Sequence, residues 1–177
     1  MPREVLDLFI TPQMIDLVVR STNLRIEETM TTLGEDTLAD STLVYTPLTS
    51  SEKVYALFGL MYFQGLLGLN MQSVDRLFFE EYGYAVFGAT MSCKQFQFLP
   101  GHLSFDDPTT RRTCWKQDRF AAFHEFFESF NANGTRHLIP SYFLSLDEAL
   151  SAMRNHISFT QYNPSLPAKY GLLFKSL

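Results

Sequence analysis

The stretch "YFLSLDEALSAMRNHISFTQYNPSLPAKYG", from Tyr142 to Gly171, decides how the chain is interpreted. A short apolar run, Tyr142 to Leu146, ends on two adjacent acids, Asp147 and Glu148. The run predicts a strand that is buried on at least one side and carries two carboxylates at its end. Two interpretations stay open from these residues alone. Asp147 caps a helix over "EALSAMRN", which the local sequence favours, or it is a ligand of a hard divalent cation.

Upstream of this stretch, capping residues and periodicity predict helices. Thr11, followed by a proline, starts a short amphipathic helix that ends near Asn23. Residues 31–47 are rich in Thr, Asp and Ser without a clean period, so they predict a loop. A helix capped by Ser50 or Ser51 is apolar on all sides, and we expect it to lie at the centre of the core.

Shorter helices follow along the chain. Ser73 caps a helix that Gly83 ends, and Ser92 caps another that ends at Pro100. Residues 106–119, "DDPTTRRTCWKQDR", predict a turn-rich connector. Four rings then fall on one face of a helix that ends around Gly134: Phe120, Phe123, Phe127 and Phe130. These patterns predict an all-helical region up to about residue 135.

The composition sets limits on the function. Of the 177 residues, 46% are hydrophobic, 15% are aromatic and only 19% are charged. A chain of this length holds one domain with a sizeable core. Its ring surface predicts either an aromatic core or a surface that a partner covers. The net charge of −5 excludes a basic footprint for nucleic acid over the whole chain, so any DNA contact is local.

The cysteines and the apolar segments indicate a cellular location. Cys93 and Cys114 form no CxxC pair and no zinc set, which fits a reducing compartment. The N-terminus lacks the hydrophobic core of a secretory signal, and the apolar run at residues 54–69 is shorter than the roughly 20 residues of a spanning helix. We therefore expect a soluble intracellular protein, nuclear or cytoplasmic, without a membrane partner.

One basic concentration surrounds Trp115: Arg111, Arg112, Lys116 and Arg119. Basic side chains interleaved with an aromatic ring are suited to a phosphate backbone. The alternative is a solvated surface, which the acidic balance of the chain favours. The four histidines show no metal-ligand spacing, and we expect each to be solvated or hydrogen-bonded.

Several segments in chain order carry a resemblance to a known family. They are "DLVVRSTN", "ALFGLMYFQGLLGL", "MSCKQFQFLPGHLSFDD", "DRF" and the final block "LSLDEALSAMRNHISFTQYNPSLPAKYG". Over nearly its whole length the sequence resembles the piggyBac transposase family. One departure is that Asn155 and His156 stand where the family usually has a Gly-Arg pair.

The resemblance implies a fold class that is mainly α, followed by the start of an α/β ribonuclease H-like domain that is truncated. Residues 1–135 correspond to the family's helical dimerisation and DNA-binding region. Residues 136–177 correspond to the first strands of an incomplete ribonuclease H-like catalytic domain. We expect one or two strands there, with Tyr170 to Leu177 as an exposed edge.

The resemblance also implies a chemistry. Asp147 matches the first of three catalytic aspartates that hold two Mg²⁺ ions for cut-and-paste DNA transposition, which favours the metal-ligand interpretation over the cap. DNA is the implied partner, and the chain is expected to dimerise with itself or with a related transposase. Six residues are possible DNA contacts: Arg111, Arg112, Lys116, Arg119, Arg154 and Lys169.

Asp147 alone does not complete the site that the family uses. The chain stops at Leu177, inside the family's second strand, so the second and third aspartates and the cysteine-rich zinc module lie outside it. Mg²⁺ held by one Asp keeps mostly water ligands and binds weakly. We expect a transposase-derived fragment that is inactive alone. Two alternatives stay open: part of an active transposase whose C-terminal half is not in this chain, or a domesticated module that binds DNA or protein.

Overall fold

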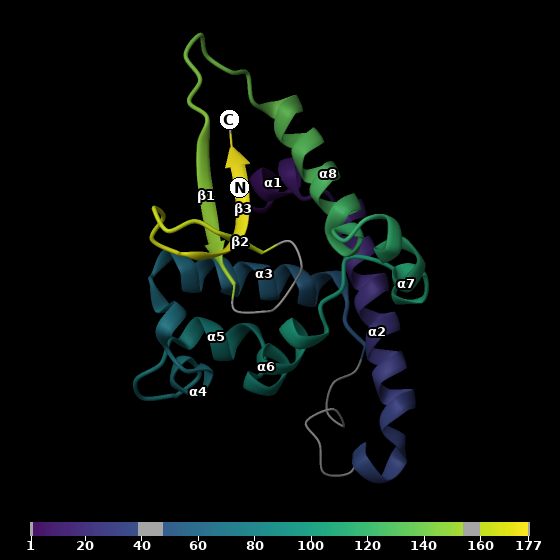
Figure 1. Cartoon of the computed structure of the whole chain (residues 1–177). Coiled ribbons are helices and arrows are strands. Elements are labelled where there is room, and N and C mark those ends of the chain that lie inside the picture. The colour runs from purple at the N-terminus through teal and green to yellow at the C-terminus, as the bar shows by residue number, and fades with distance from the viewer. Residues whose placement is uncertain (1, 39–47, 154–159, 177) are drawn as a thin grey trace. The chain divides into compact units, whose positions relative to one another are not determined.

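The computed structural model describes residues 2–38, 48–153 and 160–176, which fall into two compact units (Figure 1). One unit spans residues 1–134 and is helical. The other spans residues 135–177 and contains a small sheet. The prediction of a mainly helical chain is thereby confirmed. No helix in the described ranges is long and apolar enough to cross a membrane.

The helical unit consists of short helices around two long ones, and its boundary falls in the last turn of α8. Its elements are α1 (Pro2–Phe9), α2 (Pro12–Leu38), α3 (Ser51–Leu66), the 3₁₀ turn η2 (Leu69–Met71), α4 (Val74–Leu77), α5 (Ala85–Thr90), α6 (Cys93–His102), α7 (Pro108–Gln117) and α8 (Ala121–His137).

The core of the helical unit is built on α3, which contributes to two clusters of buried side chains. Leu57 and Leu60 pack in the cluster around Phe87, and Val54 packs in the second cluster with Ile15 of α2. All five side chains are at most 2% exposed. Full burial of such a side chain stabilises a fold by roughly 1.5–3 kcal/mol, so these clusters hold the unit together.

The predicted central place of α3 is confirmed, because the helix contributes to both clusters, but its apolar composition on all sides does not mean burial on all sides. Tyr62 and Leu66 are 78% and 73% exposed, so one side of the helix faces solvent. On that side Gly59 and Gly65 meet no neighbouring atom within 4 Å of an added Cβ. Within the helical unit, α3 therefore packs into the core through one face and leaves the other uncovered.

The predicted loop from residue 31 is also partly wrong, because α2 continues to Leu38. The hydroxyls of Thr29, Thr31 and Thr32 donate to the carbonyl oxygens four residues earlier, at 2.8 Å in each case. These bonds satisfy the threonines inside the helix, so the polar composition does not end it. The rest of the predicted loop, residues 39–47, lies outside the described residues.

Three predicted helix caps are confirmed, because cap bonds are local and depend little on tertiary context. Thr11 accepts a hydrogen bond from the amide of Met14 at 3.4 Å. Ser73 and Ser92 accept from the amides three residues later, at 3.4 Å and 3.3 Å. The starts of α2, α4 and α6 thus follow from sequence.

The helix ends were harder to predict than the starts. α4 stops at Leu77 rather than at Gly83. Gly83 serves another need, because a Cβ there would lie 2.4 Å from the carbonyl oxygen of Phe79, so the turn requires glycine. α5 was not predicted. α6 continues through Pro100 to His102 instead of ending at the proline.

The predicted connector at residues 106–119 is wrong, since most of it forms α7. Asp107 caps this helix by accepting from the amide of Thr109 at 2.8 Å, and Pro108 occupies the first helical position. The following helix, α8, ends at His137 rather than Gly134, and its buried ring is Phe126, which was not among the four predicted.

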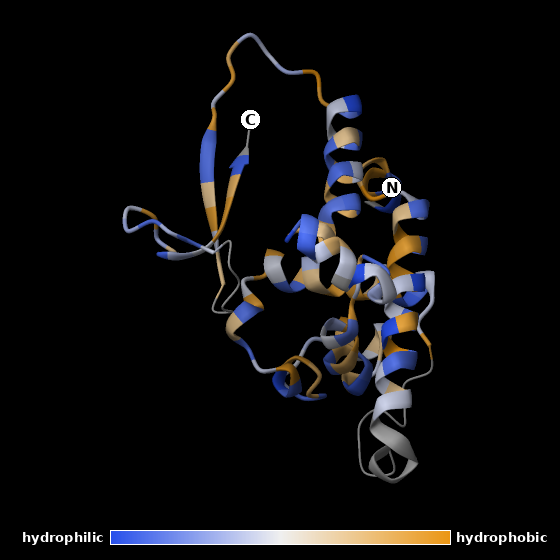
Figure 2. Cartoon of the chain, turned by 45° about the vertical axis from the view of Figure 1, so that its right-hand side comes forward, coloured by the Kyte–Doolittle hydropathy of each residue, from blue (hydrophilic) through white to orange (hydrophobic). Residues whose placement is uncertain are grey.

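The sheet unit contains β1 (Asp147–Ala152), β2 (Gln161–Tyr162) and β3 (Tyr170–Ser176). The strand order is β1-β3-β2, and both pairings are antiparallel. Figure 2 shows hydrophobic residues along β3 before its hydrophilic end. Of the described residues from 135 onward, Gly171 alone is buried, so this unit has no core of its own.

The predicted strand at Tyr142 to Leu146 is wrong, because β1 begins at Asp147. Asp147 pairs with Ser176, so the residues before it have no partner in the described part of β3. Tyr142 is fully exposed. The prediction of β3 as an edge strand is wrong, because β3 lies between β1 and β2 in the sheet and pairs with β2 through Tyr170 and Gly171.

Candidate functional site

Asp147 lies at the first residue of β1 and is exposed. Its Oδ1 accepts a hydrogen bond from the backbone amide of Glu148 at 2.8 Å, which fixes one edge of the carboxylate. No ion pair between described residues involves Asp147. The carboxylate is thus anchored to the backbone and presented to solvent without a basic partner.

Glu148 does not join Asp147 in a common site. Its Oε1 lies 3.5 Å from the Nζ of Lys175, the residue opposite it in β3. Consecutive side chains of a strand point to opposite faces, so Asp147 and Glu148 diverge. The expectation of paired carboxylates at a strand end is therefore wrong in its geometry. The helix-cap alternative is also wrong, since Asp147 begins a strand.

The described residues do not fit a complete magnesium site. They contain no group of three or more His, Cys, Asp or Glu side chains that could hold a metal ion. Asp147 fits one ligand position, because its carboxylate is exposed and not neutralised. A single carboxylate leaves Mg²⁺ mostly hydrated and weakly bound.

Arg111, one of the predicted DNA contacts, is engaged within the helical unit. Its Nε lies 3.0 Å from Oδ2 of Asp106, its Nη2 also bonds Oδ1 of that carboxylate, and Nη2 donates to the Ser104 Oγ at 2.7 Å. The Asp106 bond raises the pKa of Arg111 above its usual value. Ser104 in turn receives the Thr22 hydroxyl, which ties this network to α2.

The other predicted DNA contacts are distributed over both units. Lys116 and Arg119, in and just after the last turn of α7, are exposed in the helical unit, and Lys169 is exposed just before β3 in the sheet unit. The side chain of Arg112 and the whole of Arg154 lie outside the described part of the chain. Lys116 and Arg119 are thus the two exposed basic residues that remain near Trp115 in the sequence, and Trp115 is 55% exposed.

Two histidines behave as predicted. His102 Nδ1 lies 3.0 Å from the carbonyl oxygen of Phe98, and His124 Nδ1 lies 2.7 Å from the Oδ2 of Asp118. Both are therefore hydrogen-bonded. His156 lies outside the described residues.

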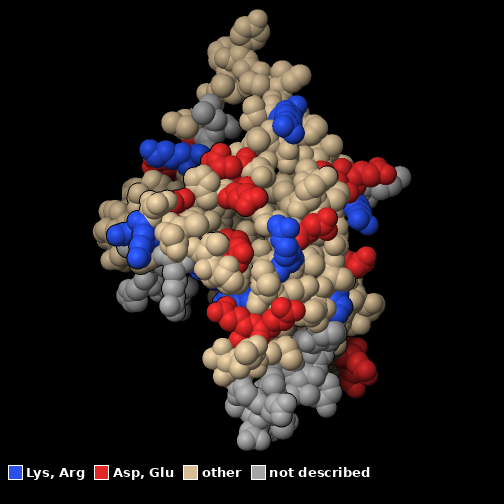
Figure 3. All heavy atoms as spheres, turned by 90° about the vertical axis from the view of Figure 1, so that its right-hand side faces the viewer, with Lys and Arg blue, Asp and Glu red and all other residues tan. Residues whose placement is uncertain are grey.

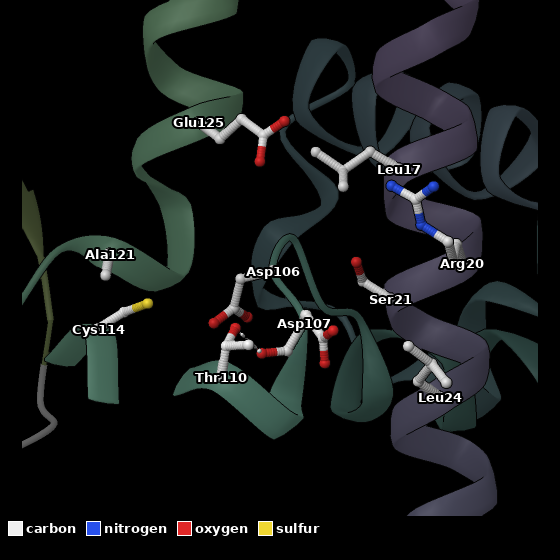
Figure 4. Close-up of a pocket in the computed structure, with 10 residues that line it drawn as sticks. All are labelled: Leu17, Arg20, Ser21, Leu24, Asp106, Asp107, Thr110, Cys114, Ala121 and Glu125. Atoms are coloured by element: carbon white, nitrogen blue, oxygen red, sulfur yellow. Dashed lines mark hydrogen bonds between the residues drawn. The ribbon is translucent and has the colours of Figure 1, made fainter. Parts of the chain in front are cut away.

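A hollow that the sequence did not predict lies between α2, α7 and α8, with a volume of about 340 Å³ (Figure 4). Carboxylates from α8 and from the start of α7 line it, among them Glu125 and Asp107. Arg20 and Ser21 of α2 line it as well. The only sequence signal was the Asp-Pro start of α7, which had been interpreted as a turn.

Comparison with known proteins identifies the family. The model of the family described as Transposase IS4 matches residues 1–176. The chain belongs to this transposase family. It also resembles the structure described as "Cryo-EM structure of piggyBac transposase synaptic complex with hairpin DNA", with a TM-score of 0.87 and 27% sequence identity.

This piggyBac-type chain spans only part of its structural relative. The match covers 98% of this chain and 35% of the other. A comparison with curated proteins found no match. The resemblance of this chain to the piggyBac transposase family is thus confirmed over almost its whole length.

Proposed function

We propose that this chain is a DNA-binding part of a piggyBac-type transposase, that Asp147 contributes one ligand of a divalent metal, and that the chain does not cut DNA by itself. The exposed, unpaired carboxylate of Asp147 at the start of β1 carries this proposal. It is supported by family membership and by the likeness to a transposase whose structure contains hairpin DNA. DNA as substrate also favours a nuclear location.

The expected architecture of the family enters as part of the proposal. The sheet unit is the beginning of a ribonuclease H-like domain, in which a strand with an acidic residue pairs antiparallel with its neighbour, as β1 pairs with β3. Residues 1–135 serve dimerisation and DNA binding, and residues 136–177 belong to the catalytic domain. Mg²⁺ is the expected ion, since Asp147 offers a hard oxygen ligand.

Inactivity of the chain alone follows from ligand number. Metal-assisted phosphodiester chemistry with two ions requires carboxylates from several segments. The described ranges supply one unpaired carboxylate near β1, while Glu148 is paired with Lys175 on the other face of the strand. The chain is therefore a contributor to a transposase site rather than a complete one.

A second candidate function is a module that binds DNA without chemistry. One observation favours it: Trp115 is exposed next to the exposed Lys116, with Arg119 just beyond α7. A ring flanked by cations suits a phosphate backbone and an unpaired base. Both functions place DNA contacts on α7, and they differ only in whether Asp147 acts.

The test combines binding and cleavage on one substrate. Fluorescence anisotropy with the 177-residue chain and a DNA hairpin should show affinity that falls with salt, and each of Lys116→Ala and Arg119→Ala should reduce the salt slope by about one. Asp147→Asn should leave affinity unchanged. Lys53→Ala, on α3, is the matched control for loss of one positive charge.

Two results would contradict the proposal. DNA binding that is absent, or that is insensitive to salt and to Lys116 and Arg119, would remove the DNA-binding claim. Hairpin cleavage by the unmodified chain in Mg²⁺, lost in Asp147→Asn, would contradict inactivity of the chain alone.

A further inference from the structure

Two tyrosine rings of the sheet unit lie side by side on its surface. Tyr162 of β2 is paired directly opposite Tyr170 of β3, and their ring centroids are 4.6 Å apart with the ring planes inclined by 35°. The two residues are 57% and 61% exposed. Cross-strand ring pairs stabilise a sheet, but this one leaves more than half of each residue open to solvent. The tyrosine pair, Tyr162 and Tyr170, therefore offers ring faces to a ligand.

The segment around the tyrosine pair differs in charge from the rest of the chain. From Ala149 to Leu177 the sequence contains no Asp or Glu, whereas it contains Arg154, Lys169 and Lys175. All 19 acidic residues therefore precede this segment. Over the helical unit, by contrast, Figure 3 shows acidic side chains interspersed with basic ones on the side that carries α2 and α7. The segment is locally basic in a chain with a net charge of −5, so it favours a negatively charged partner.

Lys169 places one of these positive charges next to the tyrosine pair. It is exposed and directly precedes Tyr170, and no ion pair between described residues involves it. Lys175 lies farther along β3 and is paired with Glu148. Among the described residues of this segment, Lys169 is thus the base that is left for a ligand. An ammonium group beside two exposed rings suits a phosphate that is followed by a base.

The tyrosine pair shares a face of the sheet with Asp147. Side chains alternate between the two faces along a strand, so Tyr170 and Phe174 lie on the same face of β3. Ala149 is paired with Phe174, and Asp147 precedes Ala149 by two residues in β1, which places Asp147 on that face as well. The pairing of Asp147 with Ser176 puts it about 20 Å from Tyr170 along the strand direction. A DNA strand that lies along this face would therefore reach both Asp147 and the tyrosine pair.

We propose that the tyrosine pair stacks on an unpaired base of the DNA, with Lys169 at the neighbouring phosphate. This inference rests on the proposed function, because it takes DNA as the ligand and names the part of the DNA that the sheet unit binds. Base faces inside a duplex are covered by their neighbours, so exposed rings gain contact only with a base that has left the stack. Every base has a π face, so the preference is for unpaired DNA rather than for a sequence. The alternative occupant, a basic protein surface, is disfavoured by the acid-free segment.

The test compares the affinity of the 177-residue chain for two DNA ligands, a hairpin with an unpaired loop and a duplex with the same stem and no loop. The chain should bind the hairpin more tightly. Tyr162→Ile and Tyr170→Ile should each weaken hairpin binding by about fivefold or more, because a ring face is lost. Both variants should leave the affinity for the duplex within about twofold, since a duplex offers no unpaired base.

Matched controls separate loss of stacking from loss of the strand. Isoleucine keeps apolar bulk and a high β-propensity, so the sheet should persist in both variants. Tyr170→Phe keeps the ring and should keep hairpin affinity within about twofold. Tyr82→Ile should also have less than about a twofold effect, because Tyr82 is an exposed ring of the helical unit beside Glu81. A second measurement needs no variant: 5-iodouracil in the hairpin loop should photocross-link to the tyrosine pair of the unmodified chain.

Three results would overturn the inference: equal affinity for hairpin and duplex, equal effects of Tyr170→Ile and Tyr170→Phe, or cross-links of the loop base that avoid both tyrosines. Each would leave a protein contact as the use of the exposed rings. Duplex binding that depends on Lys116 and Arg119 would still support the proposed function in those cases. If neither DNA bound the chain, the proposed function and this inference would both be wrong, so the two failures are distinguishable.

Discussion

The two units of the chain are stabilised by different means. Every buried hydrophobic side chain in the described residues lies at or before Phe126, in the helical unit. The sheet unit buries Gly171 alone, while Tyr142, Phe143 and Ile139 are more than 90% exposed. The helical unit is therefore held by packing, whereas the sheet unit is held mainly by the hydrogen bonds between its strands.

This difference explains where activity is expected to reside. A unit with its own core can fold alone and present a fixed surface for DNA or a protein partner. A small sheet without a core is marginal unless further elements cover it. Asp147 lies in the marginal unit, so the role proposed for it as a metal ligand rests on a sheet that its own packing does not hold in place.

The largest expected effect comes from breaking the packed unit. Phe87 is fully buried, and its ring contacts those of Phe63, Phe78 and Phe96 at centroid distances of 5.5–6.1 Å. Phe87→Ala should lower the free energy of unfolding by about 3–5 kcal/mol. Denaturation followed by circular dichroism measures it, because the helices lie in this unit.

The exposed Phe79 is the control for Phe87. Its ring is 53% exposed and stacks on Tyr82, so Phe79→Ala should change stability by less than about 1 kcal/mol. Equal losses in the two variants would contradict the assignment of the core.

The next effect concerns the sheet unit. A Cβ at Gly171 would lie 1.9 Å from the carbonyl oxygen of Ser151, so Gly171→Ala must separate β1 from β3. The strain, about 1–3 kcal/mol, exceeds what a coreless sheet can absorb. Amide exchange at Leu150 and Leu173 should become as fast as in an unfolded chain, while the helical melting curve stays unchanged.

Gly101→Ala serves as the control for Gly171, since a Cβ there meets no atom within 4 Å. If Gly171→Ala lowered the stability of the helices, the two units would depend on each other, which would contradict the view that the helical unit is held by its own packing.

A smaller effect distinguishes a structural base from a DNA contact. Arg111→Ala removes the bonds to Asp106 and Ser104 and should lower stability by about 1 kcal/mol, since the pair is partly exposed. Lys116→Ala should change stability by less than about 0.5 kcal/mol and weaken DNA binding instead. Equal stability losses, measured by denaturation, would contradict this division of roles.

The smallest effect is a pH dependence at the start of α7. Hydrogen bonds from Thr109 lower the folded-state pKa of Asp107, so the ionised form favours folding. This contribution is present above the ordinary aspartate pKa of about 3.9 and is lost as the pH falls through the lowered value. Amide shifts of Thr109 and Thr110 should report fraying of this end in acid.

Asp107→Asn is the matched variant, because it keeps a capping oxygen and removes the titration. The acid fraying of α7 should shrink in this variant. Identical acid profiles for the two proteins would show that another group controls this helix end.

Elements whose ends depend on contacts between residues close in the sequence were predicted correctly, and elements that depend on contacts between distant residues were not. The caps at Thr11, Ser73 and Ser92 were predictable because each bond spans three residues. α7 was not, because its helix has a polar sequence and its fixed position depends on the Asp106–Arg111 pair and on Ser104, which contacts Thr22 of α2. Such contacts join positions far apart in the chain.

The candidate site shows the same limit. The resemblance singled out Asp147 as a candidate metal ligand. Its place at the start rather than the end of a strand depends on the pairing with Ser176. The apolar run at Tyr142 to Leu146 predicted a strand by composition alone, and it has no partner in the described part of the sheet. The hollow between α2, α7 and α8 depends on three helices, and the Asp-Pro start of α7 was its one local signal.

The most direct test of the central claim is a Mn²⁺ titration of the ¹⁵N-labelled chain, which maps metal binding by line broadening. The account predicts weak binding, with a dissociation constant on the order of 1 mM, centred on Asp147 and absent in Asp147→Asn but retained in Glu148→Gln. Broadening centred elsewhere, or micromolar binding that survives Asp147→Asn, would contradict the assignment of Asp147 as a single metal ligand.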